Sequence, residues 1–138
     1  MCEKAIILRN ILIIEDEKLF SQLLSDALQD DGKYSIDLAE NGKEAFKLMQ
    51  DKEYELVMTD IHMPEMSGQE FIKALRSTNQ DIGIIVLTAF PKVNYIREFN
   101  DLGIEEFLTK DDCDLMALQE LVQEFFRKRD IEFLADDF

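Results

Sequence analysis

The sequence predicts an α/β domain in which helices cover both faces of a five-stranded parallel sheet. Short apolar runs alternate with amphipathic stretches, which is typical of strands followed by helices. Several of the apolar runs are continuous, as in strands that are buried on both faces. Five such strand–helix units follow one another in strict alternation, and this rhythm favours parallel strands joined by crossover helices.

The length and composition indicate one ordinary domain. The chain has 138 residues, of which 46% are hydrophobic and 33% are charged, so it can form a core and a charged surface. We interpret residues 10–128 as this domain, residues 1–9 as an N-terminal extension and residues 129–138 as a C-terminal tail.

The charge and the cysteines exclude several function classes. Asp and Glu outnumber Lys and Arg by 30 to 15, so we expect no direct binding to nucleic acid, which requires basic side chains. The same charge suits a basic protein partner or a bound cation. Cys2 and Cys113 have no zinc-like spacing, and no membrane span or signal peptide is apparent. We therefore expect a cytoplasmic protein without a membrane partner.

The first half of the chain contains three predicted strands, at residues 10–14, 35–39 and 56–59. Between the first two strands, apolar residues recur at helical spacing, which predicts a helix ending near residue 32. These residues are Leu19, Leu23, Leu24, Ala27 and Leu28. Asn41 is expected to cap the next helix, with Glu44 at the reciprocal position.

The second half continues the same pattern. Ser67 and Glu70 form a capping box that opens a third helix, and strands are predicted at residues 82–87 and 107–109. Two further helices are predicted from their apolar residues. These are Val93, Ile96 and Phe99 in the fourth helix, and Leu115, Leu118, Leu121, Val122, Phe125 and Phe126 in the fifth.

Chemically active residue types follow four of the five predicted strands. Glu15 and Asp16 follow the first strand, Asp60 the third, Thr88 the fourth and Lys110 the fifth. In the flavodoxin-like strand order 2-1-3-4-5, these four strands are neighbours, and ligands bind at the carboxyl ends of parallel strands. We therefore expect the five side chains to share one site.

Three carboxylates at one edge of a sheet favour a bound cation. At about 4 Å and an effective dielectric near 20, two like charges repel by roughly 4 kcal/mol. Mg²⁺ prefers carboxylates, water and phosphate oxygens, and no glycine-rich loop is present to hold a nucleotide. A carboxylate can itself accept a phosphoryl group. The pattern thus favours a phosphoaspartate at Asp60, with Lys110 and Thr88 binding phosphoryl oxygens.

Four segments of the sequence resemble the receiver domain of bacterial response regulators, in two-component signalling. They are residues 11–17, 59–68, 86–89 and 103–110, and the likeness extends over about residues 10–128. The resemblance implies that a phosphohistidine of a sensor histidine kinase or a histidine phosphotransfer protein phosphorylates Asp60. The only enzymatic activities that the resemblance implies are Mg²⁺-dependent self-phosphorylation from a phosphodonor and self-dephosphorylation.

The resemblance also implies the roles of individual residues. Mg²⁺ would be bound by Glu15, Asp16, Asp60 and the backbone carbonyl of His62. The phosphoryl group would contact Thr88, the backbone N–H of Ala89 and Lys110, while Thr88 and Phe107 would act as the switch. The face formed by the fourth helix, fifth strand and fifth helix would then bind a target protein or an output domain, or form a phosphorylation-dependent dimer.

Two departures from the family pattern and two alternatives remain. Asp111 follows Lys110 where the family usually has proline after a cis bond, and Phe107 lacks the hydroxyl of a tyrosine. No DNA-binding output is expected in this chain. The alternatives are a pseudo-receiver, which binds partners without being phosphorylated, and a phosphatase with an aspartyl-phosphate intermediate, similar to the haloacid dehalogenase group.

Overall fold

The computed structural model describes residues 8–29, 32–63, 66–89, 97, 101–111 and 114–136. Its five strands form one parallel sheet in the order β2-β1-β3-β4-β5. The strands are β1 Arg9–Ile14, β2 Tyr34–Ala39, β3 Leu56–Asp60, β4 Gly83–Thr88 and β5 Glu106–Thr109. The predicted strand order is confirmed, and each strand begins and ends within about one residue of its predicted bounds, as expected for short apolar runs.

The described residues form four helices rather than the five that were predicted. They are α1 Lys18–Leu28, α2 Gly42–Asp51, α3 Gly68–Thr78 and α5 Leu115–Asp136. The predicted fourth helix, with Val93, Ile96 and Phe99, lies outside the described residues. Helix α5 continues to Asp136, so most of the segment that the sequence suggested as a tail belongs to this helix.

Side-chain caps fix the starts of α2 and α3. Asn41 accepts a hydrogen bond from the backbone N–H of Glu44 at 2.8 Å, and Ser67 accepts one from that of Glu70 at 3.2 Å. Both caps satisfy an N–H group that has no partner within the helix. The Glu44 carboxylate accepts from the backbone N–H of Glu40, one residue before the expected position.

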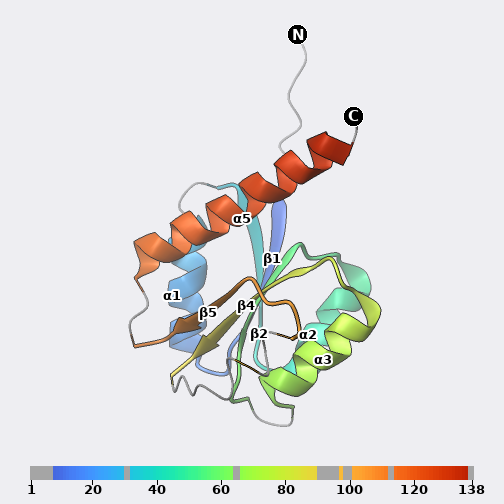
Figure 1. Cartoon of the computed structure of the whole chain (residues 1–138). Coiled ribbons are helices and arrows are strands. Elements are labelled where there is room, and N and C mark those ends of the chain that lie inside the picture. Colours follow the sequence, from blue (N-terminus) through green and yellow to red (C-terminus); the bar gives the residue numbers. More distant parts are fainter. Residues whose placement is uncertain are drawn as a thin grey trace.

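Helices α1 and α5 lie on one face of the sheet and α2 and α3 on the other (Figure 1). A hydrophobic cluster fills the space on each face. Alternate residues of β1 point to opposite faces, so Ile11 and Ile13 face α1 and α5, while Leu12 and Ile14 face α2 and α3. Strands β1, β3 and β4 are therefore covered on both sides. This arrangement leaves the carboxyl ends of the strands as the place where polar side chains gather.

The buried face of α1 differs from the predicted stripe. Ser21, Leu24, Ser25 and Leu28 are buried, whereas Leu19 is 90% exposed and Leu23 is 49% exposed. The prediction is thus confirmed for Leu24 and Leu28 and wrong for Leu19 and Leu23. The helix is rotated so that two serines take buried positions in place of those two leucines.

Helix α5 is fastened at the amino ends of the strands by two arginines. Arg129 donates hydrogen bonds to the backbone carbonyls of Glu55, at 3.0 Å, and Asp81. Arg9, at the start of β1, forms ion pairs with Glu55, at 2.9 Å, and with Asp130 of α5. Both guanidinium groups also lie over phenylalanine rings of α5.

Gly83 allows a close contact between β4 and α5. A Cβ atom at Gly83 would lie 2.3 Å from the ring of Phe125, closer than packed atoms approach. The ring therefore occupies the space that the side chain of any other residue would fill.

No helix in the described part of the chain is long and apolar enough to cross a membrane.

We expect Gly83→Ala to lower the free energy of unfolding by roughly 1–3 kcal/mol, because the added methyl group overpacks the Phe125 ring. Urea denaturation measures this loss. In a Phe125→Leu background the same substitution should cost less, since the ring is gone. An equal cost in both backgrounds would refute this explanation.

Candidate phosphorylation and metal site

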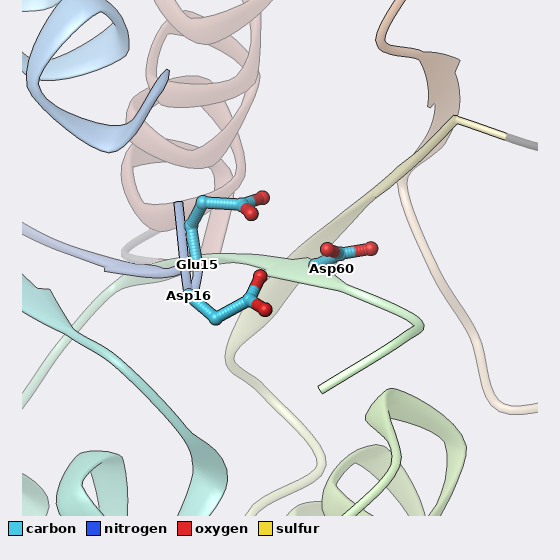
Figure 2. A group of neighbouring side chains, drawn as sticks. All are labelled: Glu15, Asp16 and Asp60. Carbon is cyan, nitrogen blue, oxygen red and sulfur yellow. The ribbon is translucent and has the colours of Figure 1, made fainter. Parts of the chain in front are cut away.

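Three carboxylates meet at the carboxyl edge of the sheet, as the strand order predicted. Asp60 is the last residue of β3 and is 4% exposed, while Glu15 follows β1 and is 1% exposed. Asp16, the next residue, is exposed. One oxygen from each carboxylate lies within 4.8 Å of the others, and Figure 2 shows the three groups around a common space.

The ammonium group of Lys110 lies between two of these carboxylates. Its Nζ atom is 2.7 Å from Oε2 of Glu15 and 3.0 Å from Oδ2 of Asp60. The contact with Asp60 is a hydrogen bond. The Lys110 side chain is only 10% exposed, so the ion pairs are weakly screened by solvent. The structure thus brings Lys110 to the carboxylates, although Asp111 replaces the proline of the family pattern.

Glu15 carries an oxygen that the described residues leave without a hydrogen bond. Oε2 is buried, and although it is close to Nζ of Lys110, the contact is an ion pair that lacks hydrogen-bond geometry. Burial raises the pKa of Glu15 to about 7; Lys110 opposes this rise, and the charge of Asp60 adds to it. A buried carboxylate oxygen without a hydrogen-bond donor is suited to bind a cation.

The two carboxylates keep Lys110 charged. Burial alone would lower the pKa of Lys110, but the close contacts of its ammonium group with the carboxylates of Glu15 and Asp60 outweigh burial and raise the pKa. The site therefore holds one lysine cation against three acidic groups. The described residues balance its negative charge incompletely, which fits a hard divalent cation bound by Glu15, Asp16 and Asp60.

The other predicted site residues lie in or beside the neighbouring strands. Thr88 ends β4 and is fully buried, Ala89 follows it, and the backbone carbonyl of Thr88 accepts a hydrogen bond from the N–H of Lys110 at 2.7 Å. Phe107, in β5, is partly buried and packs against the cluster on the α2 and α3 side. Strand pairing thus fixes the order Asp60, Thr88, Lys110 along the edge.

The loop after Asp60 is held close to it by its backbone. The N–H of His62 donates to Oδ1 of Asp60 at 3.2 Å, and the His62 side chain is exposed. A Cβ atom at Gly68 would lie 2.3 Å from the backbone carbonyl oxygen of Asp60, so only glycine permits this approach of α3. Gly68 was part of a recognised segment, yet sequence reasoning gave it no role.

A contact from α1 was also missed. The Nζ atom of Lys110 lies 5.0 Å from the ring centre of Phe20, within the range of a cation–π interaction. The sequence signal was only an aromatic residue in the first turn of a helix, four residues after Asp16.

The peptide bond between Lys110 and Asp111 is trans, as are all peptide bonds of the described residues.

Comparisons with known proteins agree with this geometry. Residues 11–124 match the family model "Response regulator receiver domain". The transcriptional regulatory protein CusR of Escherichia coli is 33% identical over 100 residues, which are 72% of this chain and 44% of CusR. The response regulator MprA of Mycolicibacterium vanbaalenii is 35% identical over 112 residues, covering 81% of this chain and 46% of MprA. The chain thus spans less than half the length of these relatives.

Solved structures show the same fold. The chemotaxis response regulator CheY4 of Vibrio cholerae is 28% identical, with a TM-score of 0.76, and the match covers 86% of this chain and 98% of CheY4. The signal receiver domain of a putative LuxO repressor protein from Vibrio parahaemolyticus is 22% identical, with a TM-score of 0.85, over 94% of this chain and 98% of that one. The chain belongs to the response regulator receiver domain family.

Proposed function

We propose that this chain is a phosphoacceptor receiver of a two-component system or phosphorelay, and that Asp60 accepts the phosphoryl group. One observation carries the proposal. The buried carboxylate of Asp60 lies beside Glu15 and Asp16 and within 3.0 Å of the Lys110 ammonium group, at the carboxyl edge of the sheet. Phosphoryl transfer depends mostly on such positioning and charge neutralisation.

In the proposed reaction, an Asp60 carboxylate oxygen attacks the phosphorus of a phosphohistidine. The P–N bond to the donor imidazole breaks as the P–O bond to Asp60 forms, and the donor is a sensor histidine kinase or a histidine phosphotransfer protein. Lys110, which donates a hydrogen bond to the unphosphorylated carboxylate of Asp60, then moves to a phosphoryl oxygen and neutralises its charge. The Thr88 hydroxyl and the N–H of Ala89 supply further donors from the end of β4.

Glu15, Asp16 and Asp60 would hold Mg²⁺, together with the backbone carbonyl of His62. When bound, the cation neutralises negative charge on the acceptor and on the transferred group. The three carboxylates place their oxygens close enough together for one ion, and the buried Oε2 of Glu15 lacks a hydrogen bond among the described residues. No other enzymatic activity than self-phosphorylation and self-dephosphorylation is proposed.

The proposed output is a change in the face that includes β5 and α5. Thr88 would move toward the phosphoryl group, and Phe107 would turn into the vacated space, which shifts the population between two packings. Thr88 is fully buried and Phe107 is partly buried in neighbouring strands, which suits this exchange. The partner is a downstream protein, an output domain or, in a phosphorylation-dependent dimer, a second copy.

Asp60→Asn should abolish phosphorylation, because the amide is not a nucleophile for phosphorus. We expect wild-type protein incubated with acetyl phosphate and Mg²⁺ to gain the mass of one phosphoryl group, measured by intact-protein mass spectrometry. Asp51→Asn, the same substitution at an exposed position of α2, should leave the gain unchanged.

The same incubation separates the alternatives. No mass gain in the wild-type protein would indicate a pseudo-receiver, and a gain that persists in Asp60→Asn would place the acceptor elsewhere. Steady hydrolysis of added phosphomonoesters would indicate a phosphatase.

The affinity for Mg²⁺ should weaken as the pH falls. Because the pKa of Glu15 is raised to about 7, the cation must displace a proton below that pH, and the dissociation constant should rise up to roughly tenfold per pH unit below about 7. Calorimetry in buffers of different ionisation enthalpy counts the released proton. Glu15→Gln should bind Mg²⁺ more weakly, without this pH dependence. If the wild-type protein bound Mg²⁺ equally well at about pH 6 and about pH 8, a raised pKa of Glu15 would be excluded as a determinant of Mg²⁺ binding.

Thr88→Ala should separate phosphorylation from switching. Asp60 keeps its carboxylate neighbours, so the variant should still gain a phosphoryl group, more slowly because one donor is lost. Its β5 and α5 amide signals, followed by NMR upon addition of beryllofluoride, should change less than in the wild-type protein. Identical changes in both proteins would remove Thr88 from the switch.

A further inference from the structure

We propose that Phe20 is a positioning residue that holds the ammonium group of Lys110 at the site when a cation occupies the carboxylates. The inference deepens the proposed function and rests on it. It assigns to α1 a contribution beyond packing. In this role Phe20 acts on the site through its contact with Lys110.

The geometry places the ammonium group among three neighbours. Glu15 approaches from the end of β1, Asp60 from the end of β3 and the ring of Phe20 from α1. The distance of 5.0 Å from Nζ to the ring centre is within the range in which a ring face attracts a cation. The Lys110 side chain is 90% shielded from solvent, so water weakens this attraction little.

The backbone N–H of Lys110 donates to the carbonyl of Thr88, but this bond does not fix the far end of the long side chain. Lys110 follows β5, which has only four residues and pairs with β4 alone at the edge of the sheet. The next residue is Asp111, and the bond between them is trans, so no proline fixes the backbone after the lysine. The place of the ammonium group therefore depends on the contacts made by the end of the side chain.

Two of these contacts compete with the proposed cation. Glu15 and Asp60 both belong to the group of carboxylates that can hold a metal ion. A divalent cation held by these carboxylates would also repel the lysine by its charge. The Phe20 ring offers no oxygen, and Mg²⁺ binds oxygen ligands. Among the three contacts described for Nζ, the ring is thus the one that the cation leaves in place.

A purely structural role for Phe20 predicts different behaviour. Phe20 is partly buried and packs against the cluster that α1 and α5 form with the sheet. If packing were its whole role, any large apolar side chain would serve. A positioning role requires the face of an aromatic ring, so Phe20→Tyr should retain it and Phe20→Leu should lose it.

The first test measures the contact without any phosphorylation. An aromatic ring shifts the NMR signals of protons above its face upfield, so the ε-CH₂ protons of Lys110 should resonate upfield of those of other lysines. The Lys110→Gln spectrum identifies the signal. We expect the shift to persist when Mg²⁺ is added, to remain in Phe20→Tyr and to vanish in Phe20→Leu. Loss of the shift upon addition of Mg²⁺ to the wild-type protein would overturn the proposal.

The second test measures phosphorylation by acetyl phosphate at saturating Mg²⁺. Phe20→Leu should lower the maximal rate by about five- to tenfold, the equivalent of a cation–π contact at a shielded site, while Phe20→Tyr stays near the wild-type rate. Mg²⁺ affinity should be the same in both variants, since Phe20 is not among the carboxylates of the metal site. Leu19→Ala, on the exposed side of α1, is the matched control with an unchanged rate.

The outcomes distinguish this inference from the proposed function. Equal slowing in Phe20→Leu and Phe20→Tyr, or a wild-type rate in Phe20→Leu, would overturn the positioning role. If the wild-type protein gained no phosphoryl group, the proposed function would fail. The NMR shift in the presence of Mg²⁺ would still decide whether Phe20 holds Lys110.

Discussion

The ammonium group of Lys110 permits two carboxylates to lie buried side by side. Without a cation between them, Glu15 and Asp60 would repel each other where solvent does little to screen the charges. Lys110 contacts both, at 2.7 and 3.0 Å, from the end of an edge strand. The carboxylates that follow β1 and β3 are therefore bridged by two ion pairs that share one lysine beyond β5. Burial still raises the pKa of Glu15 although Lys110 lowers it, so the lysine compensates only part of the cost of burying this carboxylate.

The incomplete compensation separates structural from chemical requirements. A fully neutralised cluster would favour folding but would have little affinity for a further cation. Here Asp16 is exposed and Glu15 retains a buried oxygen without a hydrogen bond among the described residues. The cluster therefore lowers the stability of the folded protein but can bind a cation, as is common where ionisable groups gather in functional sites. The burial of the apolar clusters on both faces of the sheet stabilises the fold and offsets this cost.

Much of this could be predicted from the sequence, because strand ends in a parallel sheet converge. Short apolar runs located β1, β3 and β4, and the residues after them identified the members of the site. What could not be predicted depends on rotation and close approach. The rotation of α1 buries Ser21 rather than Leu19, and it also directs Phe20 toward Lys110. The approach permitted by Gly68 depends on the loop path, which periodicity does not encode.

The arginine contacts at the amino ends of the strands have a mechanical consequence for α5. Arg129 and Arg9 fasten the later part of this helix to β1, β3 and the start of β4, far along the strands from the carboxylates. Nearer its beginning, the Gln119 side chain donates a hydrogen bond to the backbone carbonyl of Ala27 in α1. Polar contacts thus hold the later part of α5 to the strands, whereas Leu118 and Val122 in its first turns are held by apolar packing against the sheet. A change at the carboxylates can therefore reach the start of α5 by repacking of side chains, without breaking the arginine contacts at the other end.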